Sequence, residues 1–137
     1  MVDDDRASVR LRRLEELVED LEEVLEKGEE SYLANPGLRA MAERWLELAI
    51  QICIDLGTQV LAERPGPTPN RYAEVFKILG DEGSISKELA DRLAEAAKQR
   101  NLLVHLYLDI DDAKVFKSLS HLDDLRQFGA FVADQLD

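Results

Sequence analysis

The chain has 137 residues, of which 45% are hydrophobic and 34% charged, and its formal net charge is −12. A chain of this length can bury about two-thirds of its unfolded surface around one core, so we expect a single domain over residues 1–137, with residues 1–8 as a flexible acidic leader. The acidity argues against broad nonspecific affinity for nucleic acid, which depends on Lys and Arg neutralising phosphates. More than half of the imbalance lies in residues 1–30, so a local basic pocket elsewhere stays open.

Cysteine content and hydropathy argue against a disulfide-bonded, zinc-binding, secreted or membrane protein. Cys53 is the only cysteine, which excludes an internal disulfide and a cysteine-rich zinc site; no metal or cofactor is expected. The N-terminus lacks a basic stretch followed by an apolar one, and the longest apolar run, residues 46–54, is interrupted by Glu47 and Gln51. Because that run is too short to cross a bilayer, we expect a cytoplasmic protein without membrane contact.

Periodic apolar positions predict two long helices in the first half of the chain. The first covers residues 6–27 and ends at Gly28, with leucines and valines on one side and glutamates on the other. The second begins with Asn35 as N-cap and Pro36 in the first turn and runs to about Ala62. This central helix should be packed on both sides, because it carries two apolar stripes: Met41, Trp45, Leu48, Ile52 and Leu56 on one, and Leu46, Ile50, Ile54 and Leu61 on the other.

Two further helices should follow a proline-rich loop over residues 64–70. The first is short, covers residues 72–79 and closes at Gly80. The second starts after Ser86, whose side chain can cap the helix, and continues to roughly Tyr107.

A last helix should begin in the acidic turn over residues 109–112 and extend through Val132, with a bend at Ser120 or Gly129. No alternating strand pattern and no internal repeat occurs in the sequence. The prediction is therefore an all-α fold, an antiparallel bundle of four to five helices.

The helix that starts after Ser86 ends in a polar string, R-N-x-x-V-H-x-Y, which begins at Arg100. At about 100° per residue, the apolar stripe of this helix passes through Leu89, Leu93 and Ala96 into Arg100, Val104 and Tyr107. A permanently charged guanidinium thus occupies a position where an apolar residue is due. Burying it without a partner costs several kcal/mol, so Arg100 should face a second charged group, a cleft or another subunit.

Two interpretations of this string stay open on the residues alone. Arg100, Asn101, His105 and Tyr107 fall within an arc of about 160° and can line one cleft, with Leu102, Leu103 and Leu106 anchoring the other side in the core. Histidine exchanges protons near neutrality and arginine binds phosphate through paired hydrogen bonds, which suits metal-free RNA cleavage by the ribose 2′-hydroxyl. Alternatively, Arg100 and His105 complement the negative end of the helix dipole, and Tyr107 is an ordinary core residue.

The string R-x4-H-x-Y at Arg100, His105 and Tyr107 resembles the signature of HEPN domains, specifically of the HepT-like toxins of prokaryotic toxin–antitoxin pairs. The similarity includes Glu43–Arg44 in the long helix, the helix at Tyr72, I-S-x-E-L-A at residues 85–90 and the acidic turn, and so covers roughly residues 10–136. It implies a helical bundle, in agreement with the periodicity. It also implies a homodimer whose paired motif helices line a cleft and cleave RNA without a metal.

The resemblance also implies roles for individual residues. Arg100 would bind and polarise the phosphate, His105 would act as general acid or base, and Asn101 would orient both groups. Tyr107 would be adenylylated by a cognate minimal nucleotidyltransferase antitoxin, which places phosphate charge beside Arg100 and silences the toxin. The alternative is a noncatalytic HEPN adaptor, or a nucleotide- or substrate-binding subunit for a nucleotidyltransferase; a purely structural bundle comes third.

Other polar residues have simpler interpretations. Four cations are candidates for a positive cleft, although solvent-exposed roles are favoured for them: Arg71, Arg92, Lys98 and Lys114. His121 has no matching carboxylate or cysteine cluster, so no metal site is expected there. Asp55 could support an arginine, but a hydrogen-bonded or interface carboxylate is favoured.

Overall fold

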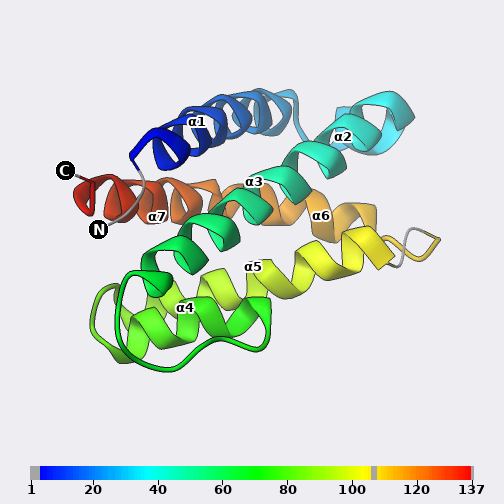
Figure 1. Ribbon diagram of the computed structural model, residues 1–137. Coiled ribbons are helices and arrows are strands. Elements are labelled where there is room, and N and C mark those ends of the chain that lie inside the picture. Colours follow the sequence, from blue (N-terminus) through cyan, green and yellow to red (C-terminus); the bar gives the residue numbers. More distant parts are fainter. Residues whose placement is uncertain (1–3, 106–107, 137) are drawn as a thin grey trace.

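The computed structural model describes residues 4–105 and 108–136, and within these ranges the regular elements are helices and no strand occurs (Figure 1). In chain order they are α1 (Asp4–Lys27), α2 (Glu29–Ala34), α3 (Pro36–Ala62), α4 (Tyr72–Asp81), α5 (Lys87–His105), α6 (Asp112–Ser118), the 3-10 helix η1 (Leu119–His121) and α7 (Leu122–Asp134). The predicted all-α antiparallel bundle is confirmed.

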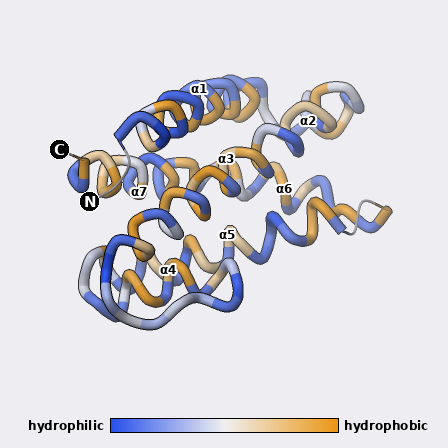
Figure 2. Tube along the Cα trace, viewed as in Figure 1, coloured by the Kyte–Doolittle hydropathy of each residue, from blue (hydrophilic) through white to orange (hydrophobic). Residues whose placement is uncertain are grey.

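Four of these helices, α1, α3, α5 and α7, form the bundle, with α3 in contact with each of the other three. Consecutive members run in opposite directions in Figure 1. Apolar residues fill the space between them, and Phe128 of α7 packs edge-on against Phe76 of α4 with ring centroids 5.2 Å apart. The hydropathy colouring in Figure 2 shows apolar and polar residues alternating along the helices, as expected of helices that pack through one side.

The helix α3 is less completely packed than the sequence indicates. Leu46, Ile50 and Ile54 are buried, as expected of one stripe. On the other stripe Leu56 is buried and Trp45, Leu48 and Ile52 pack partly against the core, but Met41 is 48% exposed. The expectation of two packed sides therefore holds only in part. By length and composition α3 could also cross a membrane, but half of its most apolar window is buried inside the bundle, as in the core helix of a globular fold. We call Met41, Trp45, Leu48 and Ile52 the α3 apolar face.

The ends of the chain differ from the predicted boundaries. Helix α1 begins at Asp4 and Ala7 is fully buried, so the expected flexible leader over residues 1–8 is wrong for residues 4–8. The last predicted helix is divided into α6, η1 and α7, and the break includes Ser120. Gly129 does not mark a bend; it lies inside α7, where an added Cβ would sit 3.3 Å from the Leu14 side chain of α1.

A short helix that the periodicity missed, α2, follows Gly28, whose φ of 89° suits glycine. Its buried anchor is Tyr32, whose ring packs against Phe116 of α6 at a centroid distance of 5.2 Å. Burial raises the pKa of Tyr32 to about 12, and its hydroxyl has no hydrogen-bond partner among the described residues. Tyr32 therefore holds α2 and α6 together through ring packing.

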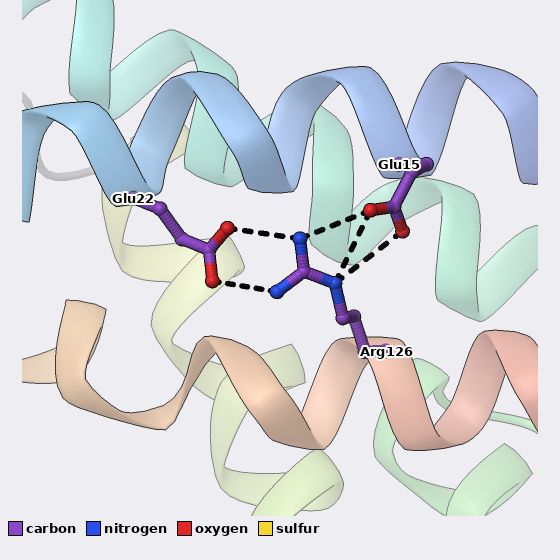
Figure 3. A network of polar contacts seen from close by, with 3 residues as sticks. All are labelled: Glu15, Glu22 and Arg126. Atoms are coloured by element: carbon purple, nitrogen blue, oxygen red, sulfur yellow. Dashed lines mark hydrogen bonds and ion pairs between the residues drawn. The ribbon is translucent and has the colours of Figure 1, made fainter.

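An ion-pair network joins the first and last helices of the bundle (Figure 3). The Arg126 guanidinium of α7 donates from Nη2 to Glu15 at 3.0 Å and to Glu22 at 2.8 Å, both on α1. Hydrogen bonding to Arg126 holds the pKa of Glu22 below its ordinary value of 4.5. A depressed carboxyl pKa contributes stability above that ordinary value, and the contribution is lost as the pH falls through the folded-state pKa. The network is partly solvent-exposed, so it contributes at most about 1 kcal/mol.

Gly80 sets the distance between α4 and α5, because a Cβ at this position would lie 2.6 Å from the Ala90 Cβ. Replacing Gly80 with alanine should lower the free energy of unfolding by about 1–3 kcal/mol through overpacking, measured by urea denaturation. Gly37→Ala is the matched control, since its Cβ would meet only the Asn35 side chain at 3.5 Å and the higher helix propensity of alanine should stabilise α3 slightly. Equal stability of Gly80→Ala and the wild type would contradict this role.

Candidate functional site

The C-terminal end of α5 is not covered by α4, because α4 packs along only part of the length of α5. The two helices pack side by side, with Gly80 of α4 against Ala90 of α5 at one end and Tyr72 against Arg100 at the other. Asn101 follows Ala90 by three turns of helix and so points in nearly the same direction. Asn101 therefore lies on the same face of α5 that α4 covers at Ala90. Because α4 starts at Tyr72, next to Arg100, it does not extend over Asn101, which is exposed.

Arg100 is partly buried, and most of its guanidinium donors make no hydrogen bond to a described residue. Its Nη1 donates to Asn101 Oδ1 at 3.1 Å, and its guanidinium carbon lies 5.4 Å from the centre of the Tyr72 ring. Its Nε is buried and has no hydrogen-bond partner among the described residues, nor does a described carboxylate form an ion pair with Arg100. A buried donor without an acceptor costs free energy, whereas Nη2, which is not enclosed and makes no hydrogen bond to a described residue, remains available to an anion.

His105 is the last residue of α5 and its side chain is exposed. It lies five positions after Arg100, which on an ideal helix is about 7.5 Å along the axis and about 140° around it. Within the described ranges no hydrogen bond connects the two side chains. The structure thus joins Arg100 to Asn101 directly and leaves His105 open to solvent one turn further on; Tyr107 and Leu106 lie outside the described residues.

Of the two described leucines expected to anchor this end of α5 in the core, one is buried and one is not. Leu103 is buried, but Leu102 is 48% exposed, so its predicted place in the core is wrong. The reason is that the flank of α5 bearing Leu102 faces a cavity between α5 and the α6–η1–α7 segment, where no further helix covers it.

That cavity, of about 710 Å³, has apolar walls and a charged rim, and Leu102 and Leu103 reach it from α5. Arg100, Asn101 and His105 do not line it. Its rim carries more carboxylates than cations, which disfavours a phosphate-bearing ligand. The cavity therefore does not include the polar residues described for the motif, although two leucines of the same string line it.

The candidate helper cations are mostly engaged elsewhere. Arg92 pairs with Asp124 at 3.0 Å and Lys98 with Glu95 at 3.1 Å, while Lys114 belongs to the cavity. Arg71 precedes Tyr72, is exposed and forms no ion pair with a described residue. Arg71 and Lys114 both lack an ion pair among the described residues, but of the two only Arg71 is next in sequence to a residue that touches Arg100.

The remaining polar candidates behave as ordinary structural groups. Asp55 accepts a hydrogen bond from Gln51 Nε2 at 2.9 Å, which agrees with the favoured interpretation of a hydrogen-bonded carboxylate. His121 lies in η1 on the cavity wall. The part of the chain that the structure describes contains no group of His, Cys, Asp and Glu able to hold a metal ion.

Sequence reasoning missed Tyr72 as a site residue. It is 45% exposed at the start of α4, and its contact with Arg100 depends on how α4 and α5 align. The small residues at Gly80 and Ala90, which allow that alignment, were the available signal.

Comparison with known proteins identifies the family. The family model described as ribonuclease HepT-like matches residues 14–132. The tRNA nuclease HepT of Aphanizomenon flos-aquae is 32% identical over 103 residues, which are 75% of this chain and 69% of that protein. The mRNA nuclease HepT of Shewanella oneidensis is 27% identical over 84 residues, 61% of this chain and 63% of that protein.

The fold has a close solved counterpart. A tri-AMPylated HEPN toxin of Shewanella oneidensis, solved in complex with MNT antitoxin, superposes with a TM-score of 0.87 at 20% identity, covering 96% of this chain and 99% of that one. Because the family model spans most of the chain and the helical architecture agrees, the chain belongs to the HepT-like ribonuclease family.

Proposed function

We propose that this protein is a metal-independent endoribonuclease, the toxin of a two-component toxin–antitoxin system. The observation that carries the proposal is the partly buried Arg100, whose Nη2 makes no hydrogen bond to a described residue, five positions before an exposed His105 in a HepT-like chain. A cation with a donor to spare beside a group able to transfer protons is the minimum that phosphodiester cleavage by a neighbouring hydroxyl requires. We place the enzyme in the cytoplasm, as a single domain.

In the proposed reaction, Arg100 binds the scissile phosphate and stabilises the charge that develops on it. The ribose 2′-oxygen attacks phosphorus while the bond to the leaving 5′-oxygen breaks, which gives a 2′,3′-cyclic phosphate and a 5′-hydroxyl. The 2′-hydroxyl loses its proton and the leaving 5′-oxygen gains one; His105 transfers the proton at one of these two oxygens, and solvent water exchanges it at the other. Asn101, already bonded to Arg100, orients the guanidinium.

The test is RNA cleavage by the purified protein in EDTA. Both tRNA and mRNA should be offered, because the two named relatives differ in this respect. We expect cleavage that persists in EDTA and leaves 2′,3′-cyclic phosphate ends. A wild-type protein that binds a nucleotidyltransferase but leaves both RNAs intact would favour the noncatalytic adaptor instead.

We further propose that a cognate minimal nucleotidyltransferase controls the site by adenylylating Tyr107. The solved HEPN toxin that shares this fold is tri-AMPylated and bound to its MNT antitoxin, which supports the same relationship here. Coexpression with a cognate minimal nucleotidyltransferase should raise the intact mass by one or more AMP groups and abolish cleavage. Tyr107→Phe should stay unmodified at that position and remain active, whereas an unchanged wild-type mass would remove the regulatory proposal.

The active form is proposed to be a homodimer. The α3 apolar face supports it, because four neighbouring apolar side chains on one helix are left partly or largely exposed in the single chain, and such patches typically mark association sites. We take this face as the contact between two copies.

A further inference from the structure

We propose that Tyr72 is part of the substrate site, where its ring holds the Arg100 guanidinium and offers a stacking surface to a nucleobase next to the scissile phosphate. This inference rests on the proposed ribonuclease function and deepens it, because it predicts that an unpaired nucleotide is recognised there. The reasoning begins with the contact between the two side chains.

The Arg100 guanidinium carbon lies 5.4 Å from the Tyr72 ring centre, within the range of a cation–π interaction. With Asn101 Oδ1 on Nη1, this contact restrains the guanidinium from two directions. Nη2 makes no hydrogen bond to a described residue and, unlike the buried Nε, is not enclosed, so its donors are the ones left for a phosphate. Tyr72 thus acts first as a positioning residue for Arg100.

The same ring remains available to a ligand, because 45% of Tyr72 is exposed despite the contact. An aromatic ring beside cations is the usual platform for single-stranded nucleic acid, since every base has a face that can stack. The neighbouring Arg71 is exposed and has no ion pair among the described residues. In a chain of net charge −12, an exposed tyrosine in contact with an arginine that has spare donors, with a second exposed arginine next to it in sequence, favours RNA over other ligands.

The proposal requires an accessible base, because a ring fixed at the surface can reach only a base that has left the helical stack. Stacking on the ring should give similar affinity for all four bases, but removing the base should weaken binding. The experiment therefore compares nucleotides with and without a base.

The probe is a set of short 2′-O-methyl RNA oligonucleotides, which the enzyme cannot cleave, each with one abasic position. Binding is followed by fluorescence anisotropy for the wild type, Tyr72→Phe and Tyr72→Leu. At one position the loss of the base should weaken wild-type binding by about tenfold, and Tyr72→Phe should behave alike. Tyr72→Leu should bind the intact oligonucleotide about tenfold more weakly and show no further loss at that position. Val9→Ala, at an exposed apolar residue of α1, is the control for general surface effects.

The outcomes separate the two proposals. If the wild type cleaves RNA but binds abasic and intact probes equally, the stacking surface is rejected and the ribonuclease stands. If it neither binds nor cleaves, the proposed function fails and this inference fails with it. A Tyr72→Leu variant that loses affinity equally at every position, or changes its oligomeric mass, shows a structural or dimer contact and also overturns the proposal.

Discussion

Replacing His105 with alanine should slow RNA cleavage by about 10²–10⁴-fold, the usual contribution of a positioned general acid or base. Arg100→Ala should cause a comparable loss, because the phosphate charge that develops during the reaction would lose its cation. Rates are measured in EDTA under conditions of saturating enzyme, so that the cleavage step rather than binding is observed.

The chain supplies matched controls for both substitutions. His121 is the other histidine and lies on the cavity wall away from the motif, so His121→Ala should cleave at the wild-type rate. Arg100→Lys keeps the charge but not the paired donors and should recover only part of the loss. Wild-type rates in both Arg100→Ala and His105→Ala would refute the proposed site, whatever nuclease activity the preparation shows.

Introducing a charge into the α3 apolar face should convert dimers to monomers and abolish cleavage. Met41→Glu and Trp45→Glu each place a carboxylate where two copies would exclude water, and disruption at the centre of an interface commonly costs about 2 kcal/mol or more. Sedimentation equilibrium gives the oligomeric mass. Because Trp45 also packs partly against the core, Met41, 48% exposed, is the variant less expected to disturb folding.

Leu33→Glu is the matched control, because Leu33 is 40% exposed on α2 and lies outside the α3 apolar face. It should remain dimeric and active. If Met41→Glu and Trp45→Glu stay dimeric, this face is not the contact, and if they become monomers with full activity, one chain is sufficient for catalysis.

Mixing two inactive variants tests whether the dimer shares its sites. If Arg100 of one protomer works with His105 of the other, a dimer of Arg100→Ala and His105→Ala keeps one intact site. Random exchange of protomers would then restore about a quarter of the wild-type activity. No recovery would place both residues of each site on the same chain.

The sequence predicted the long helices well because each has a strong apolar period. The helix expected over residues 72–79 is observed as Tyr72–Asp81, and the one expected from Asn35 ends at Ala62 as expected. Helix α2 was missed because its six residues bury only Tyr32, which is too little for a period to be recognised. Leu102 was misplaced because a helical wheel gives the direction of a side chain but not whether another helix lies there.

Some residues of the candidate site could likewise be predicted from the local sequence, and others could not. Arg100, Asn101 and His105 lie close together in sequence, so a local pattern was sufficient to single them out. The contact between Tyr72 and Arg100 could not be read locally, because it depends on the register of α4 against α5, which the Gly80–Ala90 approach sets. The exposure of the α3 apolar face likewise depends on which sides the neighbouring helices cover.

If the proposed dimer forms through the partly exposed side of α3, the activity of this protein depends steeply on its abundance. A dimer that depends on these four side chains forms in proportion to the square of the monomer concentration. At low expression most chains would be single and idle, and the specific activity would rise steeply once synthesis exceeds the dissociation constant. A cell could therefore tolerate a small leak of the toxin, yet respond sharply when its level increases.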